Sequence, residues 1–230
     1  MADHEWSGRR LPVGGARVGS GHRGAVTVPR TRRGRDSKAR IVAAAAGLMY
    51  EHGVTATSVD DVLRASGAGK SQFYHYFSSR EELIAEVLRH QLGVVLEEQG
   101  RFRLDTWDGI RDWLDAMVGA QETRRRFLGC PLGSLAGEVL EQGDLLRATA
   151  ADAFVRWQQA LTEGLSDLQA QGGLRGDVDL HAVAESTIAI LQGGYLLSSA
   201  KRDITAMRRA AQTALRLLES YAPPPAPSPA

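Results

Sequence analysis

Proline is almost absent from the middle of this chain, and that absence constrains the fold more than any other feature. Of the 8 prolines in 230 residues, five follow Ala222 and two precede Arg30, which leaves Pro131 alone in the long stretch between. Because proline breaks helix interiors, such a stretch favours long helices. The alternating β-branched and aromatic pattern typical of strands is missing. The sequence therefore predicts an all-α protein of about nine helices.

The stretch from Ser58 to Arg80 predicts two short helices joined by a tight turn. Ser58 and Asp61 have the spacing of a capping box at the start of the first helix. Gly67 and Gly69 fall in the turn, because glycine adopts the left-handed backbone that such a turn needs. The stretch is thus expected to form a helix-turn-helix unit.

The second helix of this unit, expected over residues 70–77, has an unusual outer surface. Phe73 and Phe77 lie one turn apart and are expected to point inward. The side chains left facing outward are polar or aromatic with almost no acid nearby: Lys70, Ser71, Gln72, Tyr74, His75 and Tyr76. A helix fits the major groove of DNA, which is about 12 Å wide, and such side chains bond base edges and phosphates. The alternative is a solvated helix of an ordinary bundle.

These residues resemble the helix-turn-helix of the tetracycline-repressor-like (TetR) family of bacterial transcription factors. The resemblance rests on the run Gly-x-x-Lys-x-x-Phe-Tyr-x-Tyr-Phe and the following Ser-x-Glu-Glu-Leu, within residues 39–87. It implies a homodimer on a pseudo-palindromic operator, with Lys70, Gln72 and Tyr74 at base edges. The other expected DNA contacts, mainly to phosphates, are Thr57, Ser58, Ser71, His75, Tyr76 and Arg80.

Positive charge is concentrated near the N-terminus. Residues 1–40 hold ten Lys and Arg against three Asp and Glu, whereas the remainder holds 18 against 24, within a net charge of +1. A basic arm on an acidic body is expected of a phosphate-seeking segment; the alternative is a solubilising tail. Residues 1–35 are rich in Gly and Arg and are expected to be disordered. Arg33 and Arg35 in this arm are candidates for contact with the DNA backbone or minor groove.

Four parts are predicted along the chain: a basic arm (1–35), a DNA-binding domain (36–100), a ligand-binding and dimerisation domain (101–221) and a proline-rich tail (222–230). Besides the helix-turn-helix pair, helices are expected at about 36–52, 79–99, 107–127, 134–143, 145–171, 179–200 and 203–221.

A ligand cavity in the second domain is implied by the family resemblance. The candidates to line it are large or soft side chains on helices that the family architecture brings together, with one amide: Trp113, Met117, Phe127, Cys130, Leu135, Phe154, Trp157, Gln192 and Tyr195. Gln121 and Gln158 are further amides that could orient a ligand. The segment 128–135 resembles a TetR branch that senses planar or bulky hydrophobic compounds. The alternative is that these residues are plain core.

The last two helices are the expected dimer interface, as the family resemblance implies. The final helix has an apolar band too wide for one neighbour, and the candidate interface residues are Leu191, Leu197, Met207, Ala211, Ala214, Leu215 and Leu218. Gly193 and Gly194 in mid-helix cost roughly 1 kcal/mol each relative to Ala. Close packing across the dimer or a distortion beside a cavity would offset that cost. The alternative is burial within a larger monomeric core.

The sequence offers no catalytic or metal-binding constellation. Cys130 is the only cysteine and the six histidines are scattered, so neither a disulfide framework nor a multi-cysteine metal site is expected. No secretory signal or membrane-spanning run is found, which predicts a cytoplasmic protein. Because no catalytic or metal-binding motif is found either, no cofactor is expected. The function expected is a ligand-responsive transcriptional repressor released from its operator by a small hydrophobic ligand. An activator of the same family, or a helical small-molecule-binding protein or enzyme that does not bind DNA, is the alternative.

Overall fold

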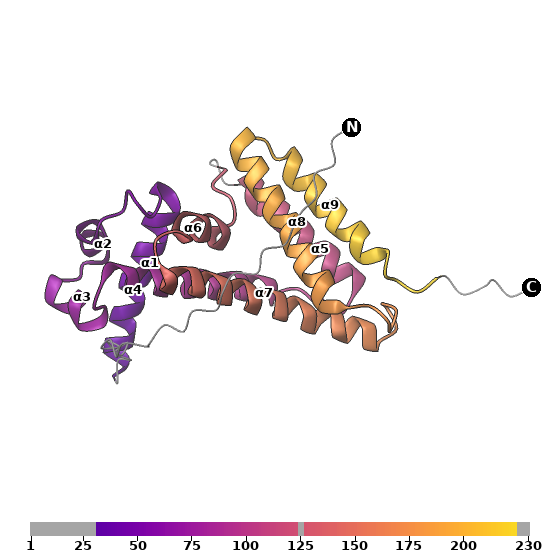
Figure 1. Ribbon diagram of the computed structural model, residues 1–230, viewed down its shortest axis with the longest axis horizontal. Helices are drawn as coiled ribbons and strands as arrows, with labels where there is room; N and C mark the ends of the chain where they lie inside the picture. The colour runs from indigo at the N-terminus through magenta and orange to yellow at the C-terminus, as the bar shows by residue number, and fades with distance from the viewer. Residues whose placement is uncertain (1–30, 124–126, 225–230) are drawn as a thin grey trace, which may run out of the picture.

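The computed structural model describes residues 31–123 and 127–224, which form nine α-helices and no strand (Figure 1). The prediction of an all-α fold is confirmed. The helices are α1 (Arg32–His52), α2 (Val59–Ser66), α3 (Lys70–Tyr76), α4 (Arg80–Gln99), α5 (Trp107–Thr123), α6 (Pro131–Val139), α7 (Asp144–Ala170), α8 (Leu180–Lys201) and α9 (Thr205–Glu219).

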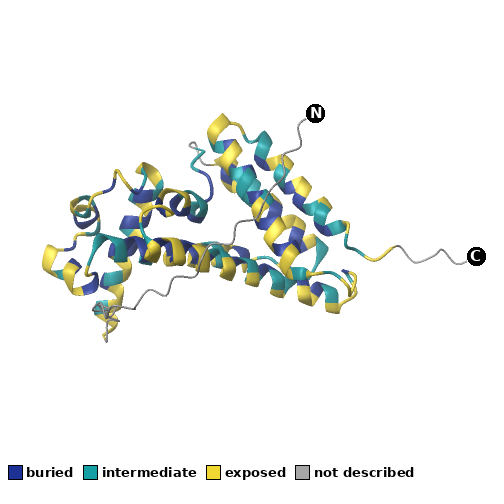
Figure 2. Ribbon diagram, viewed as in Figure 1, coloured by how far each residue is buried: buried dark blue, intermediate teal, exposed yellow. Residues whose placement is uncertain are grey.

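Helices α1 to α4 form a small bundle at one end of the molecule, here called the head (Figure 1). Figure 2 shows its buried residues on the inner faces of these helices. Ile41, Phe73 and Leu83 from three of the helices are fully buried in its core. The predicted capping box at Ser58 and Asp61 is present, and Gly67 ends α2 in the left-handed region at φ 67°. The local signals of this segment therefore agree with its fold.

Helix α1 begins four residues earlier than predicted. The Thr31 side chain accepts a hydrogen bond from the backbone N–H of Gly34 and caps the helix at Arg32. Arg33 and Arg35 therefore lie in the first helical turn and not in a disordered arm, so the predicted arm boundary at residue 35 is wrong. The rest of that arm, residues 1–30, and residues 225–230 of the predicted tail lie outside the described residues.

The remaining helices form an elongated body. Helix α7 is the longest, and its regular apolar stripe is buried at Trp157, Leu161 and Leu165. It packs against α4 at the head and against α8 further along the body. Helices α8 and α9 lie side by side at the end of the molecule away from α3 (Figure 1). The long helix thus joins the two ends of the molecule.

Helix α6 lies between the head and the α8–α9 pair. It begins at Pro131 rather than at the predicted Ser134, because proline is suited to the first turn of a helix. It ends at Val139, four residues before the predicted end. Its contacts with α1, α4 and α7 make it a bridge between head and body.

Most of the predicted dimer residues are buried within a single chain. Leu191 from α8 and four residues from α9 are at most 5% exposed, namely Met207, Ala211, Ala214 and Leu218. They cannot face a partner, because α9 turns its apolar stripe toward α8 and α5 of its own chain. Leu215 is partly buried on the α5 side of α9, beside Leu114 and Val118. Only Leu197 of the predicted set is openly exposed, at 49%.

The two glycines in α8 have different roles. A Cβ atom at Gly194 would stand 2.4 Å from the Cβ of Ala210, so this glycine lets α8 and α9 approach closely within one chain. A Cβ at Gly193 would meet no atom within 4 Å. Close packing therefore explains Gly194, but inside the protomer and not across a dimer.

Candidate nucleic-acid interface and ligand cavity

The outer face of α3 carries four exposed side chains: Lys70, Ser71, Tyr74 and His75. Their spacing places them on one side of the helix. The Tyr74 ring is 62% exposed, although large aromatic rings are usually covered. The Lys70 ammonium lies 3.4 Å from the Asp60 carboxylate in an open ion pair that a phosphate can replace. This face offers hydroxyl, ammonium and imidazole groups to a partner.

The inner face of α3 is aromatic and holds the helix firmly. Phe73 and Phe77 are buried, with ring centroids 5.2 Å apart. Tyr76 is only 6% exposed, so the prediction that it faces outward is wrong. The reason is that Tyr76 lies three residues after the buried Phe73, and residues at this spacing share one face of a helix.

Gln72 joins α3 to α1. Its side-chain amide donates a hydrogen bond of 2.7 Å to the hydroxyl of Ser37, which is itself buried. The amide predicted to contact base edges is thus engaged inside the head. Its contribution is to fix the angle of α3 against α1.

Thr57 and Arg80 also serve the interior of the head. Thr57 is 3% exposed, and its hydroxyl donates to the carbonyl of Gly53 at 2.9 Å. The guanidinium of Arg80 donates to the carbonyls of Val54 and Thr57. Both side chains were predicted to hold phosphates, but in the structure they shape the turn between α1 and α2.

Ser58 is exposed at the start of α2 and is paired with Asp61. Hydrogen bonds from the Ser58 side chain and backbone lower the pKa of the Asp61 carboxyl, with a smaller contribution from Arg64. The carboxylate therefore stays charged and keeps the helix capped. Ser58 can reach DNA only with an oxygen that already takes part in this cap.

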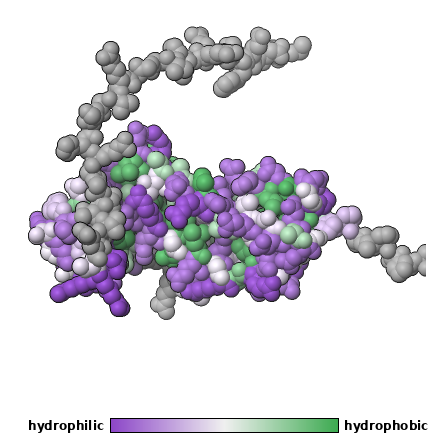
Figure 3. All heavy atoms as spheres, turned by 90° about the horizontal axis from the view of Figure 1, so that it is seen from below, coloured by the Kyte–Doolittle hydropathy of each residue, from purple (hydrophilic) through white to green (hydrophobic). Residues whose placement is uncertain are grey.

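Positive charge surrounds the start of α1. Arg32, Arg33 and Arg35 occupy or adjoin its first turn, which holds no acidic residue. The helix dipole disfavours cations at this end, so the arginines and the dipole together attract an anion. In the face of the molecule shown in Figure 3, hydrophilic side chains cover both the head and the body, and hydrophobic patches are scattered among them from the middle of the molecule to the body.

A cavity of about 360 Å³ lies in the body. Five of the nine side chains predicted to line it do so: Trp113, Met117, Cys130, Trp157 and Tyr195. The other four, Phe127, Leu135, Phe154 and Gln192, are not part of its wall. Leu135 is instead buried core, and the Phe154 ring stacks on Trp157.

The last two turns of α4 form the part of the wall that sequence reasoning missed. Val94, Val95 and Gln99 line the cavity, with Phe102 just beyond the helix. Because α4 was assigned to the DNA-binding domain alone, these residues were not considered. Val94 is 37% exposed although its side chain is apolar, and the local sequence of α4 does not distinguish such a cavity-facing position from a core position.

Of two buried polar side chains in the cavity wall, one has a hydrogen-bond partner for its N–H donor and the other does not. The indole N–H of Trp157 donates to the side-chain oxygen of Gln99 at 2.8 Å, a buried bond between α7 and α4. The Gln121 side chain is 1% exposed, and its Nε2 atom has no hydrogen-bond partner. Helix α4 is therefore tied to the cavity wall by one buried hydrogen bond, whereas Gln121 keeps an unused donor.

Two hydrogen bonds fasten α6 to the end of α1. The Tyr50 hydroxyl donates to the carbonyl of Gly129 at 2.7 Å, just before α6. The backbone N–H of Val54 donates to the Glu138 carboxylate at 2.7 Å, near the far end of α6. Because Cys130 and Pro131 at the start of α6 line the cavity, this helix touches both the cavity and the head.

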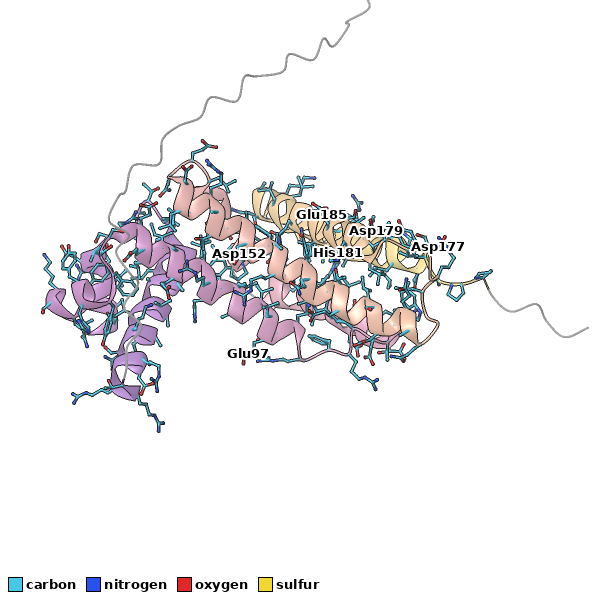
Figure 4. All side chains as sticks on the ribbon, turned by 60° about the horizontal axis from the view of Figure 1, so that its bottom comes forward. Glu97, Asp152, Asp177, Asp179, His181 and Glu185 are labelled. Atoms are coloured by element: carbon cyan, nitrogen blue, oxygen red, sulfur yellow. The ribbon has the colours of Figure 1, made fainter. Side chains whose placement is uncertain are left out.

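Clusters suited to metal binding are not found among residues 31–123 and 127–224. Figure 4 labels His181 with Asp177, Asp179 and Glu185 at the start of α8, and all four are exposed there. Asp179 accepts from the backbone N–H of Ala182 and so acts as the cap of α8. Within the same described ranges, no helix has the length and apolar character needed to span a bilayer.

Two family models match the chain. The model described as "Bacterial regulatory proteins, tetR family" matches residues 41–87, and the one described as "Tetracyclin repressor-like, C-terminal domain" matches residues 107–214. The first covers the helix-turn-helix, and the second covers most of the α8–α9 pair and the part of the cavity wall that follows Phe102. One model thus matches residues of the head, and the other matches residues of the body.

Known proteins with similar sequences are transcriptional regulators. An HTH-type transcriptional regulator of Mycobacterium tuberculosis is 31% identical over 72% of this chain and 86% of its own length. One from Lactococcus lactis is 29% identical over 75% of this chain and 88% of its own length. The reduced form of Escherichia coli NemR has the same fold, with a TM-score of 0.71 and 18% identity over 80% of this chain and 98% of that chain. The present chain belongs to the TetR family of helix-turn-helix transcriptional regulators.

Proposed function

We propose that this regulator is a repressor that binds a pseudo-palindromic operator as a homodimer and leaves it when a small hydrophobic ligand enters the body. One observation carries the proposal: α3 presents Lys70, Ser71, Tyr74 and His75 to solvent at the tip of the head, on a fully buried aromatic base. A rigid helix with an exposed polar face is what entry into a major groove requires.

The contacts with DNA divide by their position on the head. Lys70 and Tyr74, one turn apart, form one row of the exposed face and are assigned to base edges. Ser71 and His75 form the neighbouring row and are assigned to phosphates. Arg33 and Arg35 in the first turn of α1 supply further phosphate contacts, since the helix dipole there attracts anions. Gln72 and Arg80 are assigned a supporting role, because their donors already serve the head.

Dimerisation is assigned to the outer face of α8. Leu196 is 70% exposed and Leu197 is 49% exposed, and Ala189 and Ala200 are exposed on the same helix. Gly193 between them leaves room for a close approach, because a Cβ atom at this position would meet no atom of another helix or of a side chain within 4 Å. Such an apolar strip is costly in water and is covered in a dimer. Two-fold pairing then holds two α3 helices about 34 Å apart, one turn of DNA.

Release by a ligand is assigned to movements of α4 and α6. The cavity is lined by the end of α4 and the start of α6, while the opposite ends of these helices contact the α1–α2 turn through Arg80 and Glu138. A ligand that fits better when these helices are displaced changes the spacing of the two heads. To convert 1:99 into 99:1 it must favour that state by about 5.5 kcal/mol.

Selection from a pool of random duplexes tests the proposal. The full chain should retrieve one motif with two-fold symmetry whose half-sites are centred about one helical turn apart. A helical small-molecule-binding protein that does not bind DNA would retrieve no motif. A regulator of this kind works in the bacterial cytoplasm, and reporter expression from a promoter carrying the motif distinguishes repression from activation.

A further inference from the structure

Among the described residues of the cavity wall, Gln121 has a buried donor without a hydrogen-bond partner. Gln121 lies near the end of α5, is 1% exposed, and lines the cavity. Its Nε2 atom is shielded from solvent and has no hydrogen-bond partner in the described chain. A buried amide without a partner costs free energy in the ligand-free protein. The terminal torsion of a glutamine is soft, so the amide can turn toward an occupant of the cavity.

The rest of the wall restricts what that occupant can be. Trp113, Met117 and Trp157 give the wall a largely apolar and aromatic surface. The Trp157 indole N–H already donates to Gln99, so it is not available to a ligand. Glu98 is the one charged residue among those that line the cavity in the described chain. The Glu98 carboxylate is paired with the Arg101 guanidinium at 3.1 Å, and the described lining residues include no lysine or arginine that could pair with an anionic ligand.

We propose that the ligand is a neutral, mostly aromatic molecule with a carbonyl-type oxygen, and that this oxygen accepts a hydrogen bond from the Nε2 amide of Gln121. This inference rests on the proposed function, because it takes the cavity to be the site of the releasing ligand. It adds the chemical class of that ligand and the side chain that recognises it. Recognition of this oxygen explains why an apolar wall contains Gln121, whose unpaired amide otherwise only lowers the stability of the protein.

A pair of probes separates this proposal from simple hydrophobic binding. Benzophenone and diphenylmethane have the same two rings, and they differ in carrying a carbonyl or a methylene between them. Burying a carbonyl without a donor is unfavourable, so a merely apolar cavity prefers diphenylmethane. Equilibrium dialysis of the full-length protein, without DNA, is expected to show tighter binding of benzophenone.

Replacing Gln121 by methionine removes the amide but keeps the length and flexibility of the side chain. The Gln121→Met variant is expected to bind benzophenone about tenfold more weakly and diphenylmethane within about twofold of wild type. Its thermal midpoint should be equal or higher, because an unpartnered buried amide has been removed.

Gln192→Met is the matched control. Gln192 in α8 also has an Nε2 atom without a partner, but it does not line the cavity. The control is expected to retain the wild-type preference for benzophenone. A third probe, 4-benzoylbenzoate, carries the same carbonyl with a negative charge and is expected to bind at least tenfold more weakly than benzophenone, because Glu98 is the one charged residue among the described residues that line the cavity.

Four results would each overturn the inference: tighter binding of diphenylmethane to wild type, an unchanged preference in Gln121→Met, an equal loss in Gln192→Met, or binding of 4-benzoylbenzoate as tight as benzophenone. Absence of binding by both neutral probes would also overturn it. None of these measurements involves DNA. Failure here therefore leaves the DNA-binding function standing, and failure of the duplex selection leaves the ligand class standing.

Discussion

The Glu138 carboxylate in α6 accepts a hydrogen bond of 2.7 Å from the backbone N–H of Val54, the residue that follows α1 and Gly53. Val54 is fully buried, so this N–H depends on Glu138 for its partner. The Arg80 guanidinium binds the carbonyl of the same residue from the other side. Val54 is thus the point at which α6 of the body and α4 of the head act on one peptide segment.

Removal of the Glu138 carboxylate should weaken the whole protein. Glu138→Ala leaves the Val54 N–H buried and unsatisfied, and the free energy of unfolding should fall by about 1–3 kcal/mol. Glu138→Gln keeps an oxygen acceptor at the same position and should lose less than about 1 kcal/mol. Urea denaturation of the three proteins at equal concentration measures the difference. Equal losses in both variants would mean that the charge, and not the hydrogen bond, matters at this position.

Tyr74 and Tyr76 should behave in opposite ways although they are two residues apart. Tyr74→Ala should lower operator affinity about a hundredfold, the effect of two lost contacts of about 1.4 kcal/mol each, one per protomer, with the thermal midpoint unchanged because Tyr74 is exposed. Tyr76→Ala should destabilise the protein by about 3 kcal/mol, since a large buried side chain leaves a cavity. Gel shifts and thermal melts of both variants test this. A stable Tyr76→Ala protein would refute the inner position of Tyr76.

Salt dependence reports on the arginines at the start of α1. Each phosphate contact contributes about 0.9 to the slope of log affinity against log salt, so Arg33→Gln should lower it by about 1.8 in a dimer. Arg216→Gln is the matched control, because it removes the same charge from exposed α9 at the other end of the molecule. Fluorescence anisotropy at several salt concentrations gives the slopes. If both variants give the same slope, Arg33 makes no phosphate contact.

The dimer interface can be assigned by two arginine substitutions. Leu196→Arg places a charge in the exposed strip of α8 and should yield monomers in light scattering. Leu215→Arg lies on the α5 side of α9 and should remain dimeric. The reverse outcome would move the interface from α8 to the outer side of α9.

Local sequence signals predicted the head well. The Ser58 capping box, the glycine turn and the aromatic base of α3 are all encoded within a few residues of where they act. The errors of orientation are side chains that fold back onto the head instead of facing outward. Tyr76 packs inward with Phe73, and the polar groups of Gln72, Thr57 and Arg80 bond to α1 or to the turn between α1 and α2.

Contacts between distant helices were less predictable. An apolar stripe such as Met207, Ala211 and Ala214 shows that a helix is covered, but not whether its own chain or a partner covers it. In the structure its own chain does so. The cavity wall shows the same limit, because Val94 and Val95 belong to a helix assigned to the head yet line a space in the body. Periodicity identifies buried faces, whereas only the packed fold identifies their neighbours.

The central claim is that two α3 helices, held by one dimer, enter the same duplex at a fixed spacing. Insertion of 5 base pairs at the centre of the selected motif turns one half-site to the opposite side of the DNA, since a helical turn is about 10–10.5 base pairs. Fluorescence anisotropy on the original and the lengthened duplex measures the effect directly. Affinity for the lengthened duplex should fall to that for random DNA, whereas unchanged affinity would contradict the account.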